Sequence, residues 1–302
     1  MKRKLWLPVL ILSMMLALAG CKKEEDVANQ PMLEVIEYTN IIDSSATTQL
    51  ETLMKDAGIS MERQQILLEH ISQMNSSVDT EGLASIFESA HISKMTYNPD
   101  IMLAEWMNRN PTFPGYNDRI TTFSLFGDYL DIAADSTVRD VNLEMDILAL
   151  QTDTSALVGT DNLQKFKALY STIPTEKAEG VNGYAAAVQK DWKERGISIK
   201  DDEKIRMITL FCYDAQTSEL YAGHVGLIFP VEEDKEEVIY FLEKINFQEP
   251  YQLTRFANRT ELSDYLMYKY GSSKDGDAAV SFIMENNQLM EGYRQLPETT
   301  EE

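Results

Sequence analysis

Residues 205–229 read IRMITLFCYDAQTSELYAGHVGLIF, and this stretch decides the fold. Its first part, Ile205–Tyr213, is rich in β-branched and aromatic side chains, which favour a strand, and Leu220–Phe229 has the same character. The polar segment Asp214–Glu219 between them is typical of a turn. The sequence therefore predicts an antiparallel hairpin.

The segments that follow the hairpin add to the same half of the fold. Val238–Ile245 predicts a third strand, Thr260–Tyr270 a helix, and Ala279–Met284 a further short strand. An antiparallel sheet with one covering helix is therefore expected in the C-terminal half.

The upstream half has a different pattern. From Met32 to about Tyr170, apolar residues recur mostly at helical spacings, and Thr175–Arg195 predicts one more helix that ends before Gly196. A helical N-terminal half packed on a C-terminal antiparallel sheet is an α+β fold. We expect a single domain over residues 32–297, followed by an acidic tail at 298–302.

The first twenty residues have the features of an export signal. Met1–Lys4 is cationic, and Leu5–Ala19 is an apolar run that is too short to span a bilayer comfortably. The cut site Leu18-Ala19-Gly20-Cys21 resembles the lipobox of bacterial lipoproteins. That resemblance implies removal of residues 1–20 and attachment of acyl chains, such as palmitate, to Cys21.

Residues 21–31 are polar and charged, and they predict a flexible tether. More than one acyl chain gives stable anchoring. We therefore expect a lipid-anchored protein at the cell membrane, held through Cys21 and facing the extracellular or cell-wall side.

The charge of the chain excludes one class of partner. The whole sequence carries 27 Lys+Arg and 49 Asp+Glu, and residues 1–20 account for three of the basic residues, so the mature chain would have 24 against 49, a net charge of −25. Nucleic-acid binding needs basic patches that displace counterions. No nucleic-acid partner is expected, and the acidic charge favours a role in solubility over recognition through an acidic patch.

The cysteines and histidines limit the chemistry. Because Cys21 would carry lipid, only Cys212 remains, which excludes an intrachain disulfide and a cysteine-based metal cluster. His70, His91 and His224 do not have the spacing of a metal motif. We therefore expect neither a metal nor a cofactor.

The most function-like stretch is Gly223-His224-Val225-Gly226. Glycines beside a strand histidine let a ligand or another backbone come close. Glu243, which follows the apolar run Val238–Leu242 in the predicted third strand, could accept a hydrogen bond from His224 and fix its tautomer. A nucleophile would have to come from elsewhere, ideally from a helix N-terminus.

The chain also resembles a family of Gram-positive lipoproteins that is catalogued as a domain of unknown function. The resemblance extends over nearly the whole mature chain. It rests on these segments: Tyr38–Asn40, Asn117–Thr121, Ala222–Gly226, Phe241–Lys244, Pro250–Gln252, Glu261–Leu266 and Met284–Asn287.

The layout also looks like that of papain-like cell-wall amidases, in which a cysteine at a helix start attacks an amide and a strand histidine activates it. That likeness implies a cysteine where this chain has Asp118. A carboxylate there can cap the helix or act as an acid or base, but it cannot form an acyl-thioester. Cys212 is the alternative nucleophile, although its apolar neighbours favour an inert core thiol.

Three functions remain open. The candidate site residues are His224, Asp118 and Glu243, and their pattern favours a catalytically degenerate papain-like domain that binds a cell-wall or peptide ligand at the cell envelope. An active amidase or peptidase that uses His224 is the alternative. A solute-binding lipoprotein is the second alternative, but the sequence has no two-lobed alternation of strands and helices.

Overall fold

The computed structural model describes residues 27, 29–133, 135–271 and 280–296. The chain divides into two compact units, residues 1–32 and 33–302, and the second contains the helices and strands that form the fold. The predicted signal peptide, Cys21 and the predicted tail at 298–302 lie outside the described residues. Within the described residues, no helix combines the length and the apolar character that crossing a membrane requires.

The helices are α2 (Ser44–Asp56), α3 (Met61–Ser77), α4 (Pro99–Arg109), α5 (Asp118–Phe126), the 3₁₀ helix η1 (Gly127–Tyr129), α6 (Glu144–Thr152), α7 (Leu163–Tyr170), α8 (Gly180–Glu194) and α9 (Arg259–Tyr270). The strands are β1 (Val35–Thr39), β2 (Glu88–His91), β3 (Leu130–Ile132), β4 (Ile173–Pro174), β5 (Ile197–Ile199), β6 (Arg206–Asp214), β7 (Glu219–Glu233), β8 (Glu236–Lys244), β9 (Tyr251–Phe256), β10 (Ser281–Glu285) and β11 (Gln288–Leu289).

Antiparallel pairing organises these strands. In the part of the chain that the structure describes, nine strands form one sheet in the order β11-β10-β6-β7-β8-β9-β1-β2, with β4 paired to β7 beside this path. Strands β3 and β5 form a separate pair. The predicted hairpin is β6–β7, and it lies near the middle of the sheet. The predicted α+β class is confirmed, with most helices in the N-terminal half and most of the sheet in the C-terminal half.

The N-terminal half is less uniformly helical than its pattern predicts. Strand β1 pairs with β9, where Tyr38 lies opposite Thr254, and β2 then forms the edge of the sheet. The pairing partner of β1 is more than two hundred residues away in sequence, so local spacing carries little information about it. Long-range pairing overrides local preference in such short strands.

One predicted boundary was wrong, and one strand was missed. Helix α8 begins at Gly180 and not at Thr175, because Ile173 and Pro174 pair with β7 and Gly180 has a φ of +68°. A left-handed φ interrupts a right-handed helix and suits glycine. Strand β9, over Tyr251–Phe256, was not predicted, and it pairs along β8.

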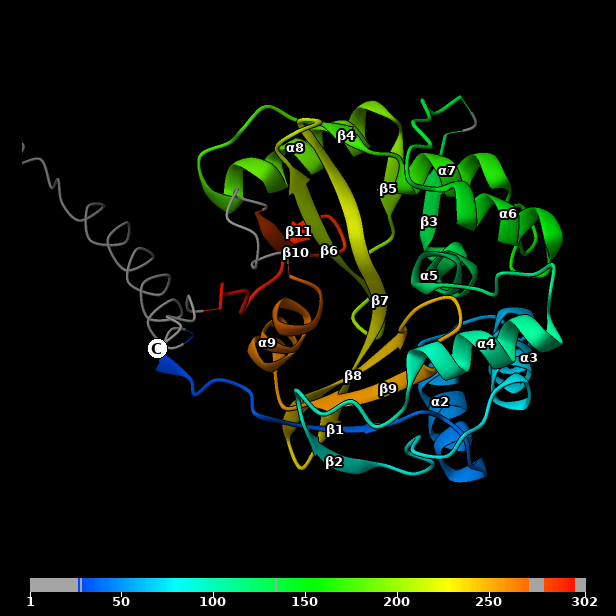
Figure 1. Cartoon of the computed structure of the whole chain (residues 1–302). Helices are drawn as coiled ribbons and strands as arrows, with labels where there is room; N and C mark the ends of the chain where they lie inside the picture. The colour runs from blue at the N-terminus through cyan, green and yellow to red at the C-terminus, as the bar shows by residue number, and fades with distance from the viewer. Residues whose placement is uncertain (1–26, 28, 134, 272–279, 297–302) are drawn as a thin grey trace, which may run out of the picture. The chain divides into compact units, whose positions relative to one another are not determined.

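The two faces of the large sheet are covered by different helices (Figure 1). Val225 and Leu227 of β7 belong to the larger hydrophobic core, together with residues of α3, α5 and α8. Phe241 of β8 packs on the other face with Leu262 of α9. Because strand side chains alternate between faces, neighbouring residues of β7 and β8 reach different layers.

A bulge interrupts the β6–β7 ladder beside His224. Leu210 pairs with His224, but the next residue of β6 pairs with Ala222, so Gly223 is an extra residue without an opposite partner. A Cβ at Gly223 would lie 2.8 Å from the Sγ atom of Cys212. The absence of a side chain at Gly223 therefore lets the bulge close on the sulfur.

The β7–β8 ladder ends near the same place. Its last pair is Leu227 with Leu242, whereas β8 continues to Lys244 in its pairing with β9. Strands β7 and β8 therefore separate beyond this pair, and the backbone of Val225 can meet a partner from another element.

Candidate functional site

A cap and an ion pair fix the start of α5. Asn117 is the N-cap residue, and its Oδ1 atom accepts a hydrogen bond from the Ile120 N–H at 3.0 Å. The Nδ2 atom of Asn117 donates to Asp146 at 2.7 Å, and Arg119 makes two further hydrogen bonds to the same carboxylate at 2.9 and 2.8 Å. A cap of this type satisfies N–H groups that have no helical partner. The side chain of Asp118 is therefore presented from a fixed helix end.

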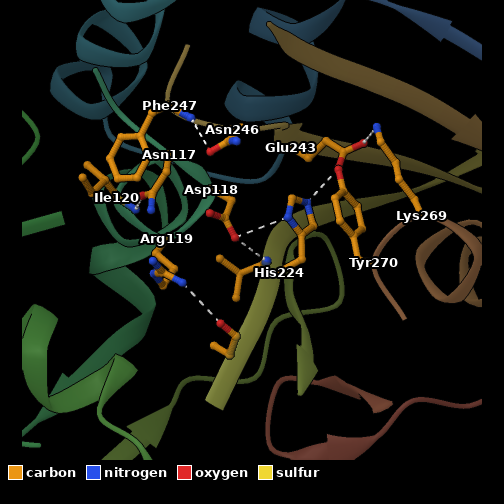
Figure 2. Close-up of polar contacts among 12 residues, drawn as sticks. Asn117, Asp118, Arg119, Ile120, His224, Glu243, Asn246, Phe247, Lys269 and Tyr270 are labelled. Atoms are coloured by element: carbon orange, nitrogen blue, oxygen red, sulfur yellow. Dashed lines mark hydrogen bonds and ion pairs between the residues drawn. The ribbon is translucent and has the colours of Figure 1, made fainter. Parts of the chain in front are cut away.

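Asp118, His224 and Glu243 meet at the point where β7 and β8 separate (Figure 2). The Oδ2 atom of Asp118 lies 3.4 Å from Nδ1 of His224, and the Oε2 atom of Glu243 lies 2.7 Å from Nε2. Asp118 Oδ2 also accepts a hydrogen bond from the Val225 N–H at 2.9 Å. The structure thus brings together all three residues that the sequence singled out.

The three side chains are buried. Asp118 is 7% exposed, His224 3% and Glu243 1%. Burying charged groups is costly unless they are paired and hydrogen-bonded. The cluster meets this condition, and so it is a fixed part of the interior.

Helix α9 and strand β9 complete the surroundings of Glu243. Tyr270 donates a hydrogen bond to its Oε2 atom at 2.7 Å, Tyr265 donates to Oε1, and Gln252 Nε2 lies 3.3 Å from Oε1. Burial alone would raise the pKa of Glu243, but the Lys269 ammonium, His224 and the tyrosine hydroxyl lower it to about 2. Glu243 is therefore a carboxylate at neutral pH.

The surroundings of His224 restrict what it can do chemically. Both ring nitrogens face carboxylate oxygens. Only an imidazolium can donate from both nitrogens, and the acceptor nitrogen of a neutral ring would face an oxygen that also accepts. In either form, no ring lone pair points to a nucleophile that it could deprotonate.

Cys212 occupies a different environment. It is 4% exposed, belongs to the hydrophobic cluster under α9, and its Sγ lies 3.5 Å from the hydroxyl oxygen of Ser281. These surroundings agree with a core thiol, because reactive thiols lie in partly exposed, electropositive sites.

Sequence reasoning missed part of the cluster. Tyr265 and Tyr270 were not among the candidate site residues, although their hydroxyl groups bind Glu243. Gln252 and Lys269 were not candidates either: the strand that carries Gln252 was not predicted, and Lys269 is one of many charged residues in the chain. The hydroxyl groups of the two tyrosines could have indicated a polar partner in the interior, because buried tyrosine hydroxyls usually form hydrogen bonds.

Comparison with known proteins places the chain beside a protein family. The family described as a domain of unknown function, DUF4300, matches residues 37–290, which include every residue of the cluster. Neither the curated proteins nor the solved structures contain a match to this chain.

Proposed function

The chain belongs to the DUF4300 family, a domain of unknown function, and we propose that it is a lipid-anchored envelope protein whose domain binds a cell-wall or peptide ligand without hydrolysing it. In this proposal the domain is a catalytically degenerate relative of papain-like amidases, and Asp118, His224 and Glu243 are what remains of the catalytic arrangement.

One observation carries the proposal. A residue at the start of a helix faces a strand histidine, and the other ring nitrogen of that histidine binds a carboxylate from the neighbouring strand. This order is the one expected of a papain-like amidase, but the helix-start residue is Asp118, whose side chain cannot form an acyl-thioester. The arrangement therefore supports a retained scaffold without the nucleophile.

The ligand class follows from the proposed location. A tether of about ten residues after Cys21 would keep the domain near the membrane, where cell-wall peptides are the substrates of papain-like amidases. The solute-receptor alternative has less support, because the described residues form one large antiparallel sheet and not two α/β lobes.

Hydrolysis of peptidoglycan fragments by the full chain and by its His224→Ala variant tests the absence of catalysis. Product release should stay at the background rate for both proteins. Hydrolysis by the wild type that the variant loses would overturn the proposal and favour the amidase alternative.

Binding is tested separately by sedimentation of the protein with purified, insoluble peptidoglycan. We expect co-sedimentation that soluble muropeptides compete away. A protein that stays in the supernatant at all concentrations would exclude a cell-wall ligand, whatever the hydrolysis assay shows.

Lipid attachment is tested by growing the producing cells with labelled palmitate. The wild-type chain should carry label and sediment with membranes, and the Cys21→Ser variant should do neither. Label that persists in this variant would place the lipid on another residue.

A further inference from the structure

Lys244, the last residue of β8, has its ammonium group inside the protein. The residue is 2% exposed. Its Nζ atom donates hydrogen bonds to the backbone oxygens of Asn246 at 2.7 Å, Phe247 at 3.4 Å and Glu249. Three carbonyls of one short loop, residues 245–250, therefore surround the buried amine.

This loop packs on the segment that leads into α5. Gly115 has a φ of +94°, and a Cβ on it would lie 2.5 Å from the carbonyl oxygen of Phe247. Gln248 Nε2 donates to the backbone oxygen of Pro114 at 2.5 Å. The loop thus braces the backbone that sets the position of Asp118.

We propose that Lys244 is the positioning residue of this site: its buried amine holds the loop at 245–250 against the segment at 114–117 and thereby places Asp118 against His224. The positioning is a property of the free protein. Only its consequence for ligand binding rests on the proposed function.

Because the amine of Lys244 can gain or lose a proton, the proposal predicts that opening of the loop depends on pH. The titratable groups that face its amine are Glu249, Asp118 and the phenol of Tyr251, whose ring centroid lies 5.0 Å away. Burial lowers the pKa of Lys244 to about 7, although Glu249 and Asp118 act to raise it. An open loop would return the amine to water, where a lysine pKa is about 10.4.

The sign of the pH effect follows from linkage. Between pH 7 and about 10 the open loop binds a proton that the closed loop has released, so a rise in pH favours the closed loop. The neutral amine still has two N–H donors for the carbonyls. The opening equilibrium constant should therefore fall by up to about tenfold per pH unit in this range.

Millisecond hydrogen exchange with mass-spectrometric detection measures this opening in the full chain without ligand. The informative amides are those of Ile245 and Glu249, which donate to backbone oxygens within the loop. Protection factors, corrected for the intrinsic pH dependence of exchange, should rise from pH 7 to pH 9 in the wild type and stay flat in Lys244→Met. Lys200→Met, which removes an exposed lysine over the Tyr129 ring, is the matched control and should keep the rise.

A second measurement tests the link to the site. The ring signals of His224 in the NMR spectrum should shift in Lys244→Met and stay unchanged in Lys200→Met. Unchanged His224 signals in both variants, or a wild-type protection profile without a rise, would overturn the proposal.

If Lys244→Met does not fold, the wild type alone decides the question. Lysine labelled with ¹³C at Cε should show one signal that titrates near pH 7. Titration of every lysine near its ordinary value would then refute the inference. None of these readouts depends on a cell-wall ligand, so the failure of the proposed function would not be confused with the failure of this inference.

Discussion

The ring of Tyr270 lies flat against the imidazole of His224, with centroids 3.6 Å apart and planes inclined by 11°. The hydroxyl group of the same tyrosine binds Glu243, which binds His224 in turn. Tyr270 therefore contacts the histidine directly through its ring and indirectly through the carboxylate. Helix α9 closes the site from one face of the sheet, while Asp118 approaches from α5, whose apolar residues pack in the core on the other face.

Removing the hydroxyl group of Tyr270 isolates the second of these contacts. Tyr270→Phe keeps the stacked ring but loses the hydrogen bond to a buried carboxylate, so we expect a loss of about 2 kcal/mol in the free energy of unfolding. Urea denaturation measures this loss. Tyr268→Phe removes a hydroxyl from a residue that is 50% exposed and should change stability by less than about 0.5 kcal/mol. Equal effects of the two substitutions would contradict the role of the hydrogen bond.

Neutralising Asp118 should also destabilise the fold. In Asp118→Asn the amide oxygen can still accept from the Val225 N–H, but the charge that faces His224 is lost. We expect a decrease of about 2 kcal/mol in unfolding free energy. The control is Asp100→Asn, which removes an acidic residue from the first turn of α4. It should lose only the interaction of the carboxylate with the helix dipole, about 0.5 kcal/mol of unfolding free energy. Urea denaturation of both variants separates the two contributions.

Glu243 makes stability depend on acid in a defined range. Its folded-state pKa of about 2 is below the ordinary value of 4.5, so its contribution is fully present above pH 4.5 and is lost as the pH falls toward 2. The difference in unfolding free energy between wild type and Glu243→Gln should shrink by about 3 kcal/mol over this range. Urea denaturation at several pH values, with Glu203→Gln as an exposed control, measures the change. A difference that does not vary with pH would show that Glu243 titrates normally.

A thiol at position 118 tests the inferred relation to cysteine amidases. In Asp118→Cys, with Cys21 and Cys212 both replaced by serine, the start of α5 and His224 should favour the thiolate. We expect a thiol pKa of about 6 or lower, compared with about 8.5 for a free cysteine. Thiolate absorbance near 240 nm as a function of pH measures this value. The control is Asp100→Cys in the same background, which places a thiol at the start of α4 without a neighbouring histidine. If the thiol pKa were similar in the two variants, the argument for descent from a cysteine amidase would be lost.

Some residues of the candidate site could be predicted from the sequence, and others could not. His224 was recognisable because Gly223 and Gly226 lie near it on a predicted strand, and Glu243 because it is a carboxylate directly after the apolar run Val238–Leu242. Their 2.7 Å contact follows from two strands that are neighbours in both sequence and space. The role of Lys244 was not predictable, because its carbonyl partners come from a loop whose shape depends on packing against the segment before α5.

The sequence by itself determined the α+β class, the central hairpin and three residues of the site, Asp118, His224 and Glu243, because these depend on side-chain patterns over a few neighbouring positions. Residues 18–21 also resemble a lipobox, and the proposed membrane anchor at Cys21 rests on that resemblance. Only the tertiary structure decided that Asp118 meets His224, that β1 joins the sheet, and that the cluster is buried under Tyr270. Those relationships depend on which distant segments pack together, and that choice is set by the free energy of the whole core and not by any local pattern.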